Sequence, residues 1–289
     1  MKNILFLLVL LSVSIFPQDY FFDHEIGKFN GASGFYIAPS GVLYVADKET
    51  NEVYKYDTTG RELKSIGGYG WDEGAFDQPE DIFATMLYVY VPDRNNHRVQ
   101  IFDKDLNFIS QIKGSQDSGQ RQSGTEDVSF GYPMGCVSSS LGDIFILDSE
   151  NRQILKLSTS GQFISRFGNY QSGDYELRSP KSMAISQDNK LLVLQEGEIL
   201  VFDQYGNGIG KIRLDIQASM INITQNNMVL NSPSKLYVYN TGEERSGIKE
   251  ITLSGYDLND GIAEGLIYKD NLYVLTAHQI AVFKKKKAE

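Results

Sequence analysis

Cysteine and histidine are scarce in this chain, which has one Cys and three His among 289 residues. A single Cys excludes an intrachain disulfide framework and any zinc or iron–sulfur site built from several thiolates. Three His residues argue against a histidine-rich metal centre. We expect Cys136 to be a buried free thiol, since an unpaired Cys behaves as a small hydrophobic residue.

Long apolar runs are also missing, apart from the eight residues Ile4 to Leu11. A membrane-spanning helix needs about 20 such residues, so the sequence predicts no transmembrane segment. Lys2, this apolar core and the small residues after it follow the order of a secretory signal peptide, with a buried first strand as the alternative. We therefore expect residues 1–18 to be a signal peptide, and the mature chain, residues 19–289, to be periplasmic or secreted.

Tyrosine, phenylalanine and glycine are abundant, at 17, 16 and 27 residues. Aromatic side chains favour strands and glycine favours tight turns, so the composition predicts an all-β protein. Hydrophobic residues make up 41% of the chain, which is enough for a sizeable core and excludes disorder over most of the length.

An internal repeat determines the predicted architecture. Six apolar runs each stop at one polar residue, and consecutive stops lie 36 to 55 residues apart: Asp47, Asp93, Asp148, Gln195, Asn231 and Thr276. A short strand precedes each run, a second run follows it after a turn, and a further strand follows in most units. Four strands repeated every 40 to 50 residues or so are typical of β-propeller blades. The sequence therefore predicts a six-bladed β-propeller with four-stranded blades.

The last blade is short of one strand after Ile280 to Phe283. Residues 22–27 repeat the spacing of residues 163–168, which we assign as the outer strand of the third blade. We expect residues 20–27 to complete the last blade, because this pairing closes the ring and leaves no open sheet edge at its seam. Residues 19–289 would then form one domain.

The second blade carries a recognisable motif. Its residues are Gly74, Phe76, Pro79, Asp93, Asn96, His97, Arg98, Val99, Phe102 and Asp103, and the third blade keeps Phe130, Pro133, Asp148, Asn151 and Ile154. This pattern resembles the NHL repeat of six-bladed β-propellers, here of an exported bacterial type. The resemblance is specific for the first three blades and architectural for the rest.

The motif residues have a structural interpretation of their own. An Asp that ends a strand accepts backbone N–H groups from the following turn, and an Arg five residues later can pair with it. We therefore predict a structural role for the motif residues Asp47, Asp93, Asn96, His97, Arg98, Asp148 and Asn151.

The same alignment predicts which residues surround the channel mouth. The residue after the Pro that enters a blade begins the innermost strand and should face the channel; these residues are Glu80, Met134 and Lys181, and Ser33 is the equivalent residue in the first blade. Trp71, the only Trp, lies in the loop entering the second blade. We predict these five as binding residues, with Trp71 as an exposed anchor. The alternative is that Trp71 packs between the first two blades.

Two main classes of function remain open, beside a third in which the protein is a purely structural module of an envelope assembly. The resemblance implies either a binding scaffold or a metal-dependent enzyme, because related propellers include a zinc-dependent lyase and calcium-dependent lactonases. His24, His97 and His278 form no apparent triplet, and no nucleophile or phosphate motif is present. We therefore predict no catalytic residue, no metal ligand and no cofactor; Ca or Zn belongs only to the alternative of a lyase or lactonase-type hydrolase in the channel.

The charge of the chain bears on its partner. The formal net charge is −10, and the loops around the predicted mouth are rich in Asp and Glu, whereas nucleic-acid binding needs a basic face. The sequence thus predicts a binding scaffold for a protein, peptide or glycan and no nucleic-acid partner, and it favours a non-enzymatic function.

Overall fold

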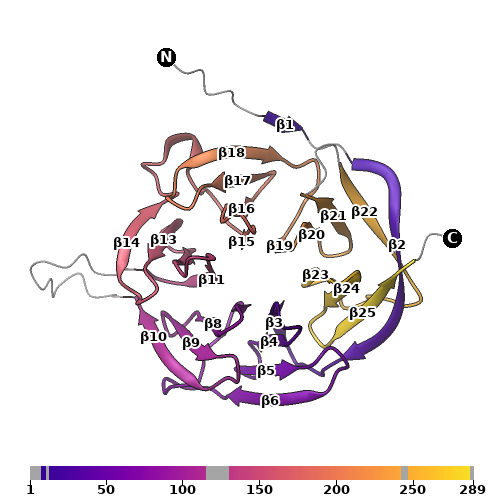
Figure 1. The fold of residues 1–289 in the computed structure, drawn as a ribbon, viewed down its shortest axis with the longest axis horizontal. Coiled ribbons are helices and arrows are strands. Elements are labelled where there is room, and N and C mark those ends of the chain that lie inside the picture. The colour runs from indigo at the N-terminus through magenta and orange to yellow at the C-terminus, as the bar shows by residue number, and fades with distance from the viewer. Residues whose placement is uncertain (1–7, 11–12, 115–129, 242–246, 287–289) are drawn as a thin grey trace, which may run out of the picture.

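β-Sheet blades arranged around a central axis make up the computed structural model of the protein (Figure 1). Three of the sheets have four strands, one has five, and one sheet of eight strands contains the last two blades. The structure describes residues 8–10, 13–114, 130–241 and 247–286. Blades 1 to 3 comprise β3 (Ala32–Ile37), β4 (Leu43–Asp47), β5 (Glu52–Tyr56), β6 (Glu62–Gly67), β7 (Phe83–Ala84), β8 (Tyr88–Asp93), β9 (Arg98–Asp103), β10 (Phe108–Lys113), β11 (Pro133–Ser138), β12 (Ile144–Asp148), β13 (Gln153–Leu157) and β14 (Phe163–Phe167). Blades 4 to 6 comprise β15 (Ser182–Ile185), β16 (Leu191–Gln195), β17 (Glu198–Phe202), β18 (Gly208–Arg213), β19 (Met220–Thr224), β20 (Asn227–Asn231), β21 (Leu236–Asn240), β22 (Ile248–Ser254), β23 (Glu264–Tyr268), β24 (Asn271–Leu275) and β25 (Ile280–Lys285). The predicted six-bladed, all-β fold is confirmed.

Burial explains the order of strands within each blade. Neighbouring strands of a blade are antiparallel, and the second strand of the first, third and fourth blades is buried at every position. A strand reads as a continuous apolar run when both faces of its sheet are covered, and here the adjacent blades cover them. Val53 of β5 and Val89 of β8, for example, belong to one hydrophobic cluster between blades 1 and 2.

The ring closes through the N-terminal strand, as the sequence predicts. β2 (Val13–Ile26) lies antiparallel to β25, from the pair Tyr20 and Lys285 to the pair Ile26 and Ile280. Tyr20 and Ile26 are each only 1% exposed, and the ring of Phe22 stacks on Tyr256 with the centroids 4.6 Å apart. β2 runs along the outer edge of the last two blades, because its first part also pairs in parallel with β22 (Figure 1).

The predicted signal peptide falls in a segment that the structure describes only in part. Of the predicted signal peptide, residues 8–10 form β1 (Leu8–Leu10), parallel to β18, and residues 13–18 begin β2; residues 1–7 and 11–12 lie outside the described residues. The signal peptide and its removal stay predictions. Within the described ranges no helix is long and apolar enough to cross a membrane, and Cys136 is a buried free thiol as expected.

Candidate functional site

The alternation of strand direction gives the ring two distinct faces. The motif face carries the loops that enter each blade and the turns after each second strand, such as residues 68–80 and 94–97. The hairpin face carries the turns after each first and third strand, such as residues 38–42, 85–87 and 139–143. The predicted binding residues belong to the motif face or to the strand starts beside it.

A buried ion pair organises the motif face in blade 2. Nε of Arg98 donates to Oδ2 of Asp93 at 2.7 Å, and the two side chains are 3% and 0% exposed. Asp93 also accepts from the backbone N–H of Asp77 at 2.8 Å and from Nδ2 of Asn96 at 2.9 Å. The carboxylate thereby joins its own turn to the loop that enters the blade.

The first and third blades repeat this arrangement without the arginine. Asp47 accepts from the backbone N–H groups of Asn30 and Gly31, and Asp148 accepts from Nδ2 of Asn151 at 2.7 Å. Gln153 occupies the place of Arg98 in blade 3, and its Nε2 donates to Asp148 at 3.1 Å. Each Asp is therefore a fixed acceptor for the loop and the turn of its blade.

The motif position of His97 has a left-handed backbone conformation. His97 has a φ of 51°, and the equivalent residues Asn51 and Arg152 have φ values of 58° and 49°. Asn and His tolerate this conformation better than bulky residues do. Nδ1 of His97 lies 3.1 Å from the carbonyl oxygen of Gly131, so His97 belongs to a turn that contacts the next blade.

The motif residues Arg98 and Asn96 donate hydrogen bonds to the backbone of the loop that carries Trp71. Nη1 of Arg98 donates to the carbonyl oxygen of Trp71 at 2.7 Å, and Nη2 donates to the carbonyl oxygen of Ala75 at 2.8 Å. Nδ2 of Asn96 donates to the carbonyl oxygen of Gly70 at 2.8 Å. The side chain of Trp71 is nevertheless 67% exposed and that of Tyr69 is 73% exposed. The structure therefore places Trp71 on the surface, not between the first two blades.

The other four predicted residues are half-buried near the start of the inner strands. Oγ of Ser33 donates to the carbonyl oxygen of Pro79 at 2.6 Å, and Nζ of Lys181 donates to that of Ala218 at 3.2 Å, so both link adjacent blades. Met134 packs against the core of blades 2 to 4. Trp71 makes no hydrogen bond or ring contact with these four residues, all of which the structure describes.

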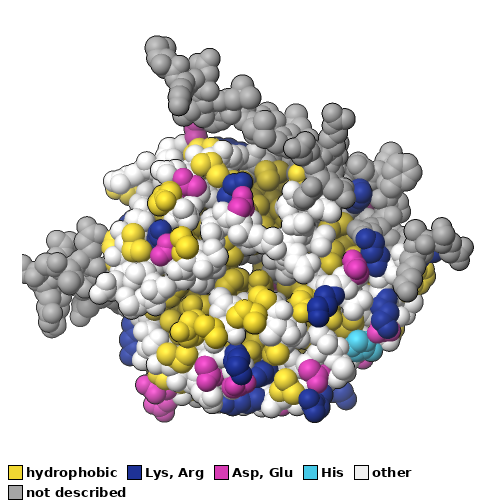
Figure 2. All heavy atoms as spheres, viewed as in Figure 1, with side chains coloured by type: hydrophobic (Ala, Val, Ile, Leu, Met, Phe, Trp, Pro, Cys, Tyr) yellow, Lys and Arg dark blue, Asp and Glu magenta, His cyan; other side chains and the backbone are white. Residues whose placement is uncertain are grey.

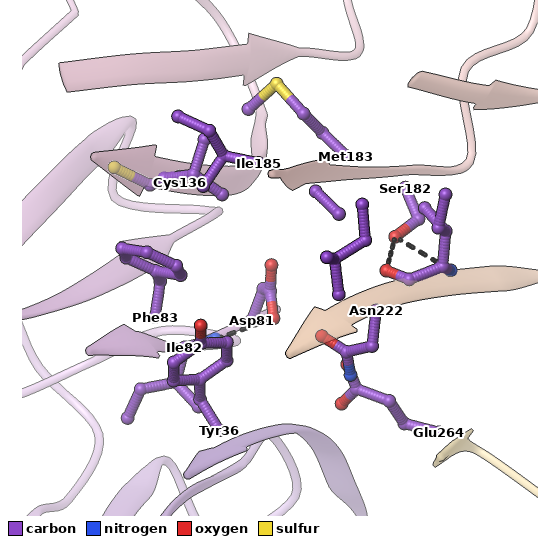
Figure 3. A pocket seen from close by; sticks show the side chains of 14 residues that line it. Tyr36, Asp81, Ile82, Phe83, Cys136, Ser182, Met183, Ile185, Asn222 and Glu264 are labelled. Atoms are coloured by element: carbon purple, nitrogen blue, oxygen red, sulfur yellow. Dashed lines mark hydrogen bonds between the residues drawn. The ribbon is translucent and has the colours of Figure 1, made fainter. Parts of the chain in front are cut away.

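In blades 2 and 4 the channel cavity is lined by the residue after the predicted one, because successive side chains of a strand point in opposite directions. Asp81 and Ser182 stand there, one place after Glu80 and Lys181, together with Asn222 and Glu264 (Figure 3). Glycine makes room for Asp81, since a Cβ on Gly34 would lie 2.9 Å from its Oδ1. Sequence reasoning missed these residues by one position in blades 2 and 4.

The channel residues form a polar cluster around a small cavity. Nδ2 of Asn222 donates to Oε1 of Glu264 at 2.6 Å, and the backbone N–H of Phe35 donates to Oε2 at 2.8 Å. Oδ1 of Asp81 accepts from the backbone N–H of Ile82 at 2.8 Å. The cavity has a volume of about 20 Å³, room for one water molecule, which needs about 10–15 Å³ of such space.

Burial changes the acidity of both channel carboxyls. It raises the pKa of Asp81 to about 7, and the neighbouring charge of Glu80 acts in the same direction. Burial and the charge of Asp81 raise the pKa of Glu264 well above its usual value. None of the side chains that line the cavity is a Lys, Arg or His, so no cation there offsets the two acids.

The residues present do not fit the metal centres that the resemblance implies. In the part of the chain that the structure describes, no three His, Cys, Asp or Glu side chains gather closely enough to hold a metal ion. Nδ1 of each histidine lies near a different group, namely Asp23 for His24, Gly131 for His97 and Phe29 for His278. The channel offers two carboxylates and one amide, whereas Ca²⁺ takes six to eight oxygen ligands.

Comparison with known proteins agrees with the architecture. A family model described as a 6-bladed beta-propeller matches residues 125–259, slightly less than half of the chain. Protein brain tumor from Drosophila melanogaster is 29% identical over 151 residues, which are 50% of this chain and 13% of that protein. The chain thus spans only a small part of the length of this curated relative.

Solved structures share the fold at low sequence identity. Virginiamycin B lyase from Staphylococcus aureus has a TM-score of 0.62 at 10% identity, over 90% of this chain and 98% of that chain. A candidate gluconolactonase has a TM-score of 0.64 at 10% identity, over 91% of each chain. At this identity the likeness establishes the fold alone: this chain is a six-bladed β-propeller.

Proposed function

We propose that the protein is an exported NHL-type propeller that binds a protein, peptide or glycan partner through its motif face, without a cofactor. One observation supports this proposal above others: a loop fixed by several hydrogen bonds presents two large aromatic side chains to solvent. Tyr69 and Trp71 lie in that loop, and Arg98 and Asn96 hold its backbone.

The hydrogen bonds to this loop reduce the cost of binding. Ordering a loop at an interface consumes part of the interaction free energy, and a loop ordered beforehand avoids this loss. Trp and Tyr are also the side chains most often found at the energetic centre of interfaces. A rigid loop with both residues exposed therefore has the properties of an anchor for a partner.

The charges beside the anchor favour a cationic or neutral partner. Asp72 and Glu73 are exposed directly after Trp71. Nucleic acid would meet repulsion there, because its phosphates need basic residues. We propose a periplasmic or secreted location on the strength of the N-terminal sequence, Lys2 followed by the apolar core Ile4 to Leu11.

A metal-dependent lyase or lactonase-type hydrolase is the second candidate, favoured by the polar cluster of Asp81, Asn222 and Glu264 in the channel. Its weakness is the donor set described above, which supplies too few oxygen ligands for Ca²⁺ and no imidazole for Zn²⁺. Metal analysis of the purified protein distinguishes the two candidates, since stoichiometric Zn or Ca would favour the enzyme.

The binding proposal is tested by capture from an envelope extract, followed by titration of the captured partner. Trp71→Ala is expected to reduce the affinity at least tenfold. Tyr205→Ala is the matched control, because Tyr205 is 69% exposed in a turn of the hairpin face, and this variant should bind as the original protein does. Equal capture by all three proteins, or salt-sensitive RNA binding, would contradict the proposal.

A further inference from the structure

An apolar groove lies on the hairpin face, opposite the Trp71 loop. Its volume is about 580 Å³, and its lining residues include Pro39, Phe83, Met86, Leu87 and Tyr88. We call it the hairpin-face groove. Figure 2 shows hydrophobic side chains gathered beside the central opening on the face in view, over the blades of β3, β8 and β11.

The hairpin-face groove exposes apolar surface that the fold itself leaves uncovered. Met86 is 56% exposed and Leu87 is 62% exposed, although both lie in a turn, where polar residues are usual. None of the residues that line the groove is charged; its polar members are hydroxyl side chains such as Thr85, Ser139 and Thr159. Contiguous apolar surface of this kind marks interaction sites.

The groove and the channel cavity share two aromatic side chains. Tyr36 and Phe83 line both spaces, and their ring centroids lie 4.7 Å apart. Asp81 precedes Phe83 by two residues, about 7 Å along an extended chain. Figure 3 shows the Asp81 carboxylate directed into the cavity, with Asn222 and Glu264 on the facing side.

The two carboxylates beneath the groove have no cation of their own. No Lys, Arg or His lines the cavity, and the small space beside Asp81 holds a group of the size of one water molecule. An ammonium group has this size. Lysine carries it on a flexible stem of four methylenes, comparable in length to the span of about 7 Å between Phe83 and Asp81 along an extended chain, and this stem packs well against aromatic rings.

We propose that the hairpin-face groove and the channel carboxylates form one binding site for a peptide segment in which a lysine lies between apolar residues. The apolar side chains lie against Met86, Leu87 and Phe83. The lysine side chain lies along the edge of the paired Tyr36 and Phe83 rings, which contact each other, and its ammonium group pairs with Asp81 and with the carboxylate of Glu264 on the facing side. The apolar lining selects the neighbouring residues, and the carboxylates select the charge.

The test uses two acetylated and amidated pentapeptides, Ala-Leu-Lys-Leu-Ala and the same peptide with norleucine in place of lysine. Binding is measured by calorimetry on the full chain. The lysine peptide is expected to bind at least tenfold more tightly than the norleucine peptide. Equal binding of the two, or no binding of either, would overturn the proposal, and this comparison on the unmodified protein requires no variant.

Variants then assign the two parts of the site. Asp81→Asn should remove the preference for lysine and leave the norleucine peptide unaffected, whereas Leu87→Ser should weaken both peptides. Asp188→Asn is the matched control, because Asp188 is an exposed carboxylate in another turn of the hairpin face. Retention of the lysine preference in Asp81→Asn would contradict the proposed pairing. The Trp71→Ala variant should bind both peptides as the original protein does. The peptide experiment therefore tests the hairpin-face groove independently of the motif-face proposal.

Discussion

Arg98 and Asp93 form a buried ion pair whose other hydrogen bonds reach across the motif face. The guanidinium group donates to the carboxylate at 2.7 Å and also to the carbonyl oxygens of Trp71, Asp72 and Ala75. The planar arrangement of five N–H donors in arginine allows all these contacts at once, which a lysine cannot reproduce. The pair therefore supports both the turn of blade 2 and the exposed aromatic loop.

Removal of the arginine is expected to be costly. Arg98→Ala leaves Asp93 buried without its charge partner, and such losses amount to about 3–5 kcal/mol of unfolding free energy. Urea denaturation measures this value. Arg61→Ala is the control, since Arg61 is 75% exposed in its pair with Asp57 and should cost less than about 1 kcal/mol. Similar costs for the two variants would refute the structural role of Arg98.

Ring closure by β2 predicts a large effect of truncation. A chain of residues 28–289 lacks β2 and with it the buried side chains of Tyr20 and Ile26. Each buried side chain of this size contributes about 1.5–3 kcal/mol to the free energy of unfolding. Its melting temperature should fall far below that of residues 19–289. Within the strand, Ile26→Ala should destabilise the protein and Phe21→Ala should not, because Phe21 is 44% exposed. Equal melting temperatures of the two chains would show that closure does not depend on β2.

The channel carboxyls predict an unusual dependence of stability on pH. The pKa of Asp81 rises from 3.8 to about 7 in the folded protein, so folding favours the protonated form. This contribution is complete below pH 4 and is lost as the pH rises through 7, and the free energy of unfolding should fall by about 2–4 kcal/mol over that interval.

The other groups that face Asp81 are also acids. Burial raises the pKa of Glu264 well above its usual value, so this group adds to the effect, whereas the raised pKa values of Tyr36 and Cys136 keep both side chains protonated throughout the interval. Chemical denaturation between pH 4 and pH 8 provides the measurement. Asp81→Asn should flatten the profile, and Asn222→Asp should steepen it. The carboxyls of Asp57 and Asp105, whose pKa values are lowered to about 2 by hydrogen bonds from Thr59 and Lys104, titrate below this interval. A profile of Asp81→Asn that matches the original protein would count against the assignment.

The rigidity of the Trp71 loop can be tested without changing the aromatic residues. Asn96→Ala removes the hydrogen bond to the carbonyl oxygen of Gly70 and should speed amide hydrogen exchange in residues 68–76. If rigidity contributes to affinity, this variant also binds the motif-face partner more weakly, although Trp71 is intact. Unchanged exchange in this segment would show that Asn96 does not order the loop.

The fold was predictable from the sequence because each blade repeats the same apolar periods. The stops at Asp47, Asp93 and Asp148 coincide with the ends of β4, β8 and β12, and the spacing of residues 22–27 was sufficient to locate the closing strand. Such local patterns determine strands and turns directly.

The channel was less predictable, because it depends on register and on distant blades. A shift of one residue exchanges the two faces of a strand, and the motif alignment selected Glu80 where Asp81 faces the cavity. Glu264 and Asn222 belong to blades that have lost the motif, so no local signal connects them with Asp81. The exposure of Trp71 was also undetermined, because it depends on hydrogen bonds from Arg98, which is 27 residues away.

Closure by β2 also has a consequence for the order of folding. Asp23 and Lys284 form an ion pair across 261 positions of the chain, so β2, which precedes all six blades in the sequence, reaches its place only when the last blade exists. Contacts this distant in sequence form late and slowly. Until then β25 presents an unpaired edge, and β2 of another copy fits that edge as well as the chain's own strand does. Refolding at high protein concentration is therefore the condition under which strand exchange between copies competes with the closing of each ring.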